Sequence, residues 1–114
     1  MANEQTAFFP NGPTVVITAN SSAPTAAQIL PTFTAATPPT NQYRVINAGT
    51  VVAFLGVGAT AAIAATNAAA VTATGNGIPL VPGAVEVFNF PPISFFTATA
   101  ASSTTLYITP GQGL

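Results

Sequence analysis

The 114-residue chain has the length of a single domain, and its most unusual property is the near absence of charge. Charged residues make up 3% of the sequence, Arg44, Glu4 and Glu86, against about 25% in ordinary domains. The chain has no Cys, which excludes disulfides, zinc fingers and thiol chemistry. A net charge this close to zero favours association and indicates a subunit largely covered by neighbours. The alternative is a small neutral domain with Thr on its outer faces.

The residues that catalysis needs are missing, so the sequence predicts that the chain is not an enzyme. The serines have no His, Lys or Asp that could activate them as nucleophiles. Two carboxylates can hydrolyse glycosides, but Glu4 is expected in an arm that could not hold it in place. Glu86 is expected on a strand, as a surface or paired carboxylate. Two isolated carboxylates form no metal cluster, and we predict no catalytic, cofactor-binding or metal-binding residues.

The sequence also argues against nucleic acid and membrane partners. The single cation can neutralise about one phosphate, so the electrostatic attraction to nucleic acid nearly vanishes. The uncharged run 51–71 is long enough to span a membrane, but polar residues interrupt it and no basic cluster flanks it. The first residues lack the basic and apolar regions of a signal peptide, so we expect the protein to stay where it is made.

Short strands separated by turns are predicted from the N-terminus onward. Pro10–Pro13 is a turn, and the β-branched run Thr14–Thr18 after it predicts a strand. A second short strand is expected around Ala27–Leu30. Two adjacent prolines cannot lie in a central strand, so Thr34–Asn41 is expected to be a loop.

The middle of the chain predicts a β-hairpin. Gln42–Asn47 and Thr50–Gly56 are expected to be its strands, because Ala48-Gly49 between them suits a tight turn. Side chains alternate between the faces of the first strand: Tyr43 and Val45 on one, and Gln42, Arg44 and Ile46 on the other. The following segment, Ala59–Ala70, stays open between a short helix and an extended loop. Alanine favours a helix, but an alanine face buries little.

Three more strands are predicted in the last third of the chain. Ala84–Phe90 is apolar on both faces except at Glu86 and Asn89, as expected inside a sandwich or beneath a partner. Ile93–Thr99 and Thr104–Thr109 follow. In the last strand Leu106 and Ile108 face one way, and Thr105, Tyr107 and Thr109 face the other.

Regularly spaced short strands with turns between them predict an all-β fold, a β-sandwich, and favour a jelly roll among sandwiches. The expected organisation is an N-terminal arm at 1–13, a sandwich domain at 14–109 and a C-terminal tail at 110–114. The termini are rich in Pro and Gly, and we expect them to form extended arms that reach onto neighbouring subunits.

Arg44 and Glu86 are the two charges within predicted strands. Their scarcity suggests the hypothesis that they form an ion pair, in one subunit or across an interface. The alternative is that Arg44 is an ordinary surface charge, which contributes about 0–1 kcal/mol in any pair.

Three segments carry a resemblance to a known family: YRVINAGTVVAFLGVG, GIPLVPGAVEVFNF and SFFTATAASSTTLYITPGQGL, at 43–58, 77–90 and 94–114. They resemble jelly-roll capsid decoration, or cement, proteins of tailed bacteriophages. The resemblance implies a virion structural protein, made in the host cytoplasm, that binds the outside of a capsid shell. It implies a homo-oligomer, with dimer and trimer both open, whose partner is the major capsid protein. No motif matches position by position, so no functional residues follow from the resemblance.

Two alternative functions stay open at this point. One is a tail, fibre or portal-adjacent structural component. The other is a carbohydrate-binding β-sandwich module, for which Tyr43 and Tyr107 are the candidate aromatic platforms.

Overall fold

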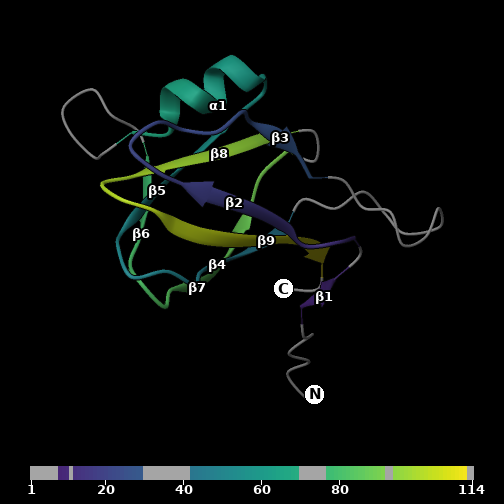
Figure 1. Ribbon diagram of the computed structural model, residues 1–114. Helices are drawn as coiled ribbons and strands as arrows, with labels where there is room; N and C mark the ends of the chain where they lie inside the picture. The colour runs from purple at the N-terminus through teal and green to yellow at the C-terminus, as the bar shows by residue number, and fades with distance from the viewer. Residues whose placement is uncertain (1–7, 11, 30–41, 70–76, 92–93, 113–114) are drawn as a thin grey trace, which may run out of the picture.

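The computed structural model describes residues 8–10, 12–29, 42–69, 77–91 and 94–112, which form two antiparallel sheets packed together (Figure 1). The all-β sandwich predicted from the sequence is confirmed. Sheet A contains β1 (Phe9–Pro10), β2 (Val15–Ala19), β4 (Gln42–Asn47), β7 (Val85–Asn89) and β9 (Thr104–Gln112). Sheet B contains β3 (Ala27–Gln28), β5 (Ala53–Gly58), β6 (Ile78–Leu80) and β8 (Phe95–Ala100). Within these residues there is one helix, α1 (Ala61–Asn67), which follows β5.

The strands pair in a nested order. β2 pairs with β9, β3 with β8, β4 with β7 and β5 with β6, all antiparallel, so the first half of the chain pairs with the second half in reverse. β9 also pairs with β4, and β8 with β5, which completes the orders β2-β9-β4-β7 and β3-β8-β5-β6. The chain therefore crosses from one sheet to the other at most of its connections.

The core lies between the sheets and follows the alternation of each strand. Tyr43 and Val45, predicted to share one face, are fully buried, while Arg44 and Ile46, predicted to share the other, lie half-buried on the outer face. The largest inward side chains are Ile17, Ile29, Tyr43, Leu55, Leu80, Phe96, Leu106 and Ile108. Each such side chain contributes about 1.5–3 kcal/mol when it leaves water.

The predicted hairpin of Gln42–Asn47 and Thr50–Gly56 is wrong, because β4 and β5 lie in different sheets. β4 pairs with β7 and β9, whereas β5 pairs with β6 and β8. The turn after Asn47 directs the chain across the sandwich, and β5 begins only at Ala53. A local turn pattern does not distinguish a hairpin from such a crossing.

A single buried amide holds this crossing in place. Asn47 Nδ2 donates to the carbonyl oxygens of Val51 and Leu80 at 2.9 and 2.8 Å. Its Oδ1 accepts from the Gly49 amide at 3.0 Å and from Thr104 Oγ1 at 2.8 Å. All four hydrogen bonds that an Asn side chain can readily make are therefore formed, and they join β4, the β4–β5 connection, β6 and β9.

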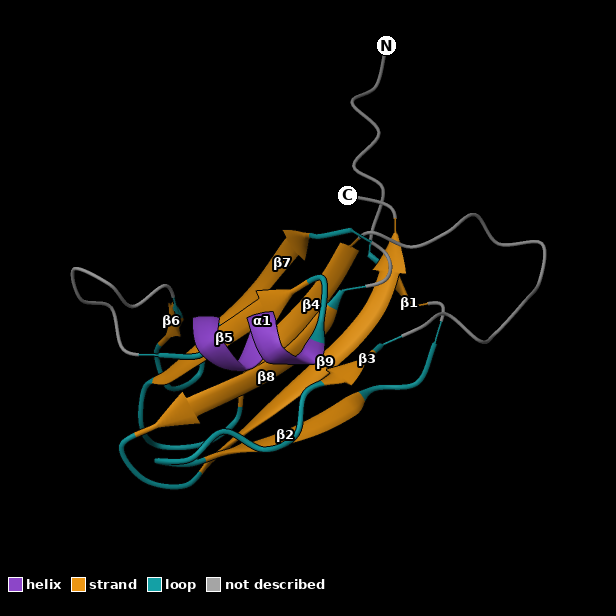
Figure 2. Cartoon of the chain, turned by 90° about the horizontal axis from the view of Figure 1, so that it is seen from above, coloured by secondary structure: helices purple, strands orange, loops and turns teal. Residues whose placement is uncertain are grey.

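The alanine-rich segment forms a helix, which settles the choice left open by the sequence. Thr60 caps it by accepting from the Ile63 amide at 3.2 Å. α1 lies on the outer face of sheet B, over β5 and β8 (Figure 2). Gly56 permits this close approach, since a Cβ there would overlap the Ala64 carbonyl. Small residues on α1 and on sheet B therefore allow close backbone contact, which compensates for the large apolar face that the helix lacks.

The sheets extend beyond the predicted domain boundaries of 14 and 109. Phe9 and Pro10 in the predicted arm pair with Gln112 and Gly111 in the predicted tail, within the same chain. The loop predicted at Thr34–Asn41 lies outside the described residues.

Replacing Asn47 by Ala is expected to lower the free energy of unfolding by about 2–4 kcal/mol, because two buried and two part-buried partners lose their hydrogen bonds together. Chemical denaturation measures the change. Asn89→Ala, at an exposed position of β7, is the matched control and should change stability by less than about 0.5 kcal/mol. Equal effects of the two substitutions would show that the Asn47 network is not structurally important.

Candidate assembly surface

Four apolar side chains form a row across the outer face of sheet A. Strand register places Val16 opposite Tyr107, Tyr107 opposite Ile46, and Ile46 opposite Val85. The row therefore runs at right angles to the strands, through β2, β9, β4 and β7. Val16 is 58% exposed, Tyr107 39% and Val85 59%, and Ile46 is half-buried between them. These residues are called the apolar row below.

The side chains that flank the apolar row are neutral except for Arg44. On one side, Thr14 Oγ1 and Thr109 Oγ1 share a hydrogen bond of 2.7 Å, and Thr109 lies opposite Arg44. On the other side, Thr18 lies opposite Thr105. Among the described strands of sheet A, Arg44 is the one charged residue at an outward position. A partner that covers this face would have little charge to desolvate.

The charge of Arg44 is partly covered by an aromatic ring. Its Cζ lies 5.2 Å from the centroid of the Phe8 ring, which is the geometry of a cation–π contact. Arg44 Nε is buried and has no hydrogen-bond partner within the described part of the chain. Phe8 directly precedes β1, so the pairing of β1 with β9 places this ring near the outer face.

Glu86 does not pair with Arg44 in one chain. Glu86 lies opposite Val45, whose side chain is in the core, so Glu86 projects from the inner side of β7. Arg44 projects from the outer side of β4. Glu86 is nevertheless exposed, because β7 is the edge strand of sheet A. The hypothesis of an intrachain ion pair is wrong, and a pair across an interface stays a prediction.

The two tyrosines lie in opposite environments. Tyr43 is 0% exposed and packs in the core, with its ring centroid 4.8 Å from that of Phe96. It therefore offers no platform to a carbohydrate. Burial raises the pKa of Tyr43 above its usual value of 10.0 by desolvating the phenolate. Tyr107 is exposed and lies in the apolar row.

The described residues contain no group of three His, Cys, Asp or Glu side chains that could hold a metal ion. Glu4 lies outside the described residues, so the structure describes no contact between Glu4 and Glu86. In the same part of the chain, no helix reaches the length and hydrophobicity that crossing a membrane requires. The uncharged run 51–71 instead supplies β5 and α1.

Comparisons with known proteins found no match for the chain among protein-family models, curated proteins or solved structures.

Sequence reasoning did not single out Val16, Ile46 and Val85. Each was predicted to lie in a strand, and the alternation of its own strand shows which face it shares with its neighbours. The row exists only because the register aligns four strands that are far apart in the sequence. No pattern within one strand contains that information.

The buried tyrosine is expected to make stability depend on pH above about 10. The folded pKa of Tyr43 is raised, so its contribution is complete below the unfolded pKa and is lost as the pH rises toward the folded pKa. Chemical denaturation as a function of pH, with tyrosinate absorbance, measures this. Tyr43→Phe should remove this component of the dependence, and Tyr107→Phe should retain it. Identical alkaline profiles for both variants would rule out Tyr43 as the cause.

Proposed function

We propose that this protein is a virion structural protein that binds the outside of a capsid shell and stabilises it as a homo-oligomeric decoration, or cement, protein. The observation that carries the proposal is the apolar row on an almost uncharged sheet face. Exposed apolar side chains gathered in this way are typical of a surface that another protein covers. The resemblance to phage decoration proteins directs the choice of partners toward the major capsid protein and further copies of this chain.

The proposal includes a jelly-roll fold. It is supported by the nested pairing of β2 with β9, β3 with β8, β4 with β7 and β5 with β6. A long antiparallel hairpin that rolls up on itself gives this order, with its strands divided between two sheets. Jelly rolls of eight strands are common in viral capsid proteins.

The proposed mechanism is the burial of apolar area across subunit boundaries. Each Val or Ile side chain that becomes fully buried contributes about 1.5–3 kcal/mol. Association itself costs about 4–15 kcal/mol, so the apolar row alone supports a weak contact for one copy. Many copies on one lattice would stabilise the shell collectively, and both a dimer and a trimer fit this scheme.

The carbohydrate-binding alternative now depends on Tyr107 alone, because Tyr43 is buried. Tyr107 lies on a sheet face between Val16 and Ile46, in register with both. A sugar site needs several polar side chains that converge on the aromatic ring, whereas both cross-strand neighbours of Tyr107 are apolar and its polar neighbours on β9 are two threonines. The virion proposal is therefore preferred.

Copy number in purified particles tests the proposal directly. Quantitative mass spectrometry against the most abundant shell protein should give a ratio close to one, or a simple fraction of it, as lattice symmetry requires. A handful of copies per particle would instead favour a tail, fibre or portal-adjacent component. Absence of the protein from particles would exclude a virion role.

Lysine substitutions in the apolar row should prevent attachment without unfolding the domain. Val16→Lys and Val85→Lys each place a charge on the proposed contact, and we expect occupancy of shells to fall by at least about tenfold, equivalent to about 1.4 kcal/mol. Rebinding of purified protein to stripped shells, followed by sedimentation, measures the loss.

The control is Val81→Lys, because Val81 is 58% exposed, as Val16 is, but follows β6 and lies outside the apolar row. It should attach as the unmodified protein does, and all three variants should keep their thermal unfolding temperature within a few degrees. Equal attachment of Val16→Lys, Val85→Lys and Val81→Lys would show that this face is not the contact.

A further inference from the structure

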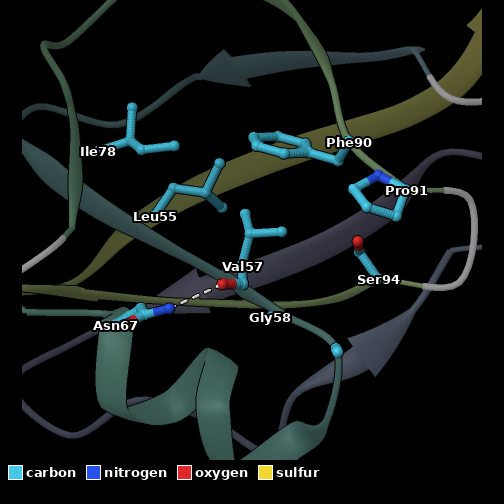
Figure 3. A pocket seen from close by; sticks show the side chains of 9 residues that line it. Leu55, Val57, Gly58, Asn67, Ile78, Phe90, Pro91 and Ser94 are labelled. Atoms are coloured by element: carbon cyan, nitrogen blue, oxygen red, sulfur yellow. Dashed lines mark hydrogen bonds between the residues drawn. The ribbon is translucent and has the colours of Figure 1, made fainter.

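A pocket of about 400 Å³ opens between the two sheets at one end of the sandwich (Figure 3). Leu55, Val57 and Ile78 form its wall on sheet B, where Ile78 of β6 pairs with Leu55 of β5. Phe90 and Pro91 form the opposite wall, on the connection that leaves β7 for sheet B. The pocket lies apart from the apolar row, which is on the outer face of sheet A.

The pocket has an apolar lining and no charge among its described residues. Its polar lining side chains are Asn67 and Ser94. Asn67 Nδ2 donates to the Val57 carbonyl at 2.9 Å, so its donor already holds the end of α1 against β5. The Ser94 hydroxyl is directed toward Pro91 (Figure 3). A charged ligand would lose its hydration here without gaining an ionic partner, so the lining selects a neutral molecule.

The aromatic wall is held in position by its neighbours. The Phe90 ring lies 5.5 Å from Phe88, 5.7 Å from Phe96 and 6.3 Å from Tyr43, measured between centroids. Such contacts restrain the ring, so it cannot readily turn into the pocket and fill it. At the other side, Gly58 and Ala59 line the pocket without bulky side chains. The space is therefore preformed, which lowers the entropic cost of binding.

The volume decides what kind of occupant fits. An apolar cavity of about 150 Å³ holds one benzene molecule, and pockets for small molecules begin at about 300 Å³. A pocket of about 400 Å³ accommodates more than one ring or a short aliphatic chain. We propose that this pocket binds a small, neutral, mainly apolar molecule, of the size of two or three aromatic rings. The proposal does not depend on the virion role.

Binding can be measured with N-phenyl-1-naphthylamine, a neutral probe whose fluorescence rises in apolar surroundings. We expect saturable binding to the intact chain with a Kd of about 10–100 µM, as the ligand efficiency of a molecule of this size allows. Methyl NMR spectra should show shifts at Leu55, Val57 and Ile78. The absence of saturable binding, or shifts confined to Val16 and Val85, would overturn the proposal.

Matched substitutions separate the pocket from other apolar surfaces. Ala59→Phe adds a ring at an exposed lining position and should weaken probe binding at least tenfold. Ala62→Phe makes the same change at an exposed position of α1 outside the described lining and should leave binding unchanged. Ile78→Phe and Ile63→Phe form a second pair for the same comparison. Equal binding by the two members of both pairs would show that the probe does not occupy the pocket.

Discussion

The sandwich depends on the side chain of Asn47, which joins its two sheets through a buried amide. Its four hydrogen bonds connect β4, β6, β9 and the crossing between β4 and β5. A buried polar network that is fully satisfied specifies one arrangement, because any other leaves polar groups without partners. Gly49 belongs to the same constraint, since a Cβ there would overlap Thr104. The nested strand order is thus fixed where the chain passes from β4 in sheet A to β5 in sheet B.

Small residues, rather than large apolar side chains, form the contact between α1 and sheet B. α1 packs on sheet B through Gly56 and Gly58, and its buried residue is Ala64. Thr99 Oγ1 donates to the Ala68 carbonyl at 2.9 Å and fastens the end of the helix. Close backbone contact and hydrogen bonds therefore hold the helix, which explains how a segment with little to bury is ordered.

Much of the fold could be predicted from the sequence, because strand alternation is a local property. The division of β4 side chains between two faces, the strand of β2 and the sandwich class all follow from residue patterns of a few positions. The pairing of β4 with β9, the crossing at Asn47 and the apolar row depend on register between distant strands. Without that register, the sequence could show neither that the predicted hairpin is absent nor that Val85 belongs to the apolar row. The position of Glu86 on the inner side of the edge strand β7 also follows from register, which the pattern within β7 does not show.

The edges of the sheets have a consequence for how copies of this chain can meet. β3 has two residues, β6 contains Pro79, and β7 carries Glu86 on its inner side. Short strands, prolines and inward-pointing charges all oppose the addition of another strand. Strand addition has no natural end and leads to fibrils, whereas contacts between faces can close with point symmetry. At these three edges the chain therefore opposes open-ended strand addition, although almost no charge repulsion separates its copies.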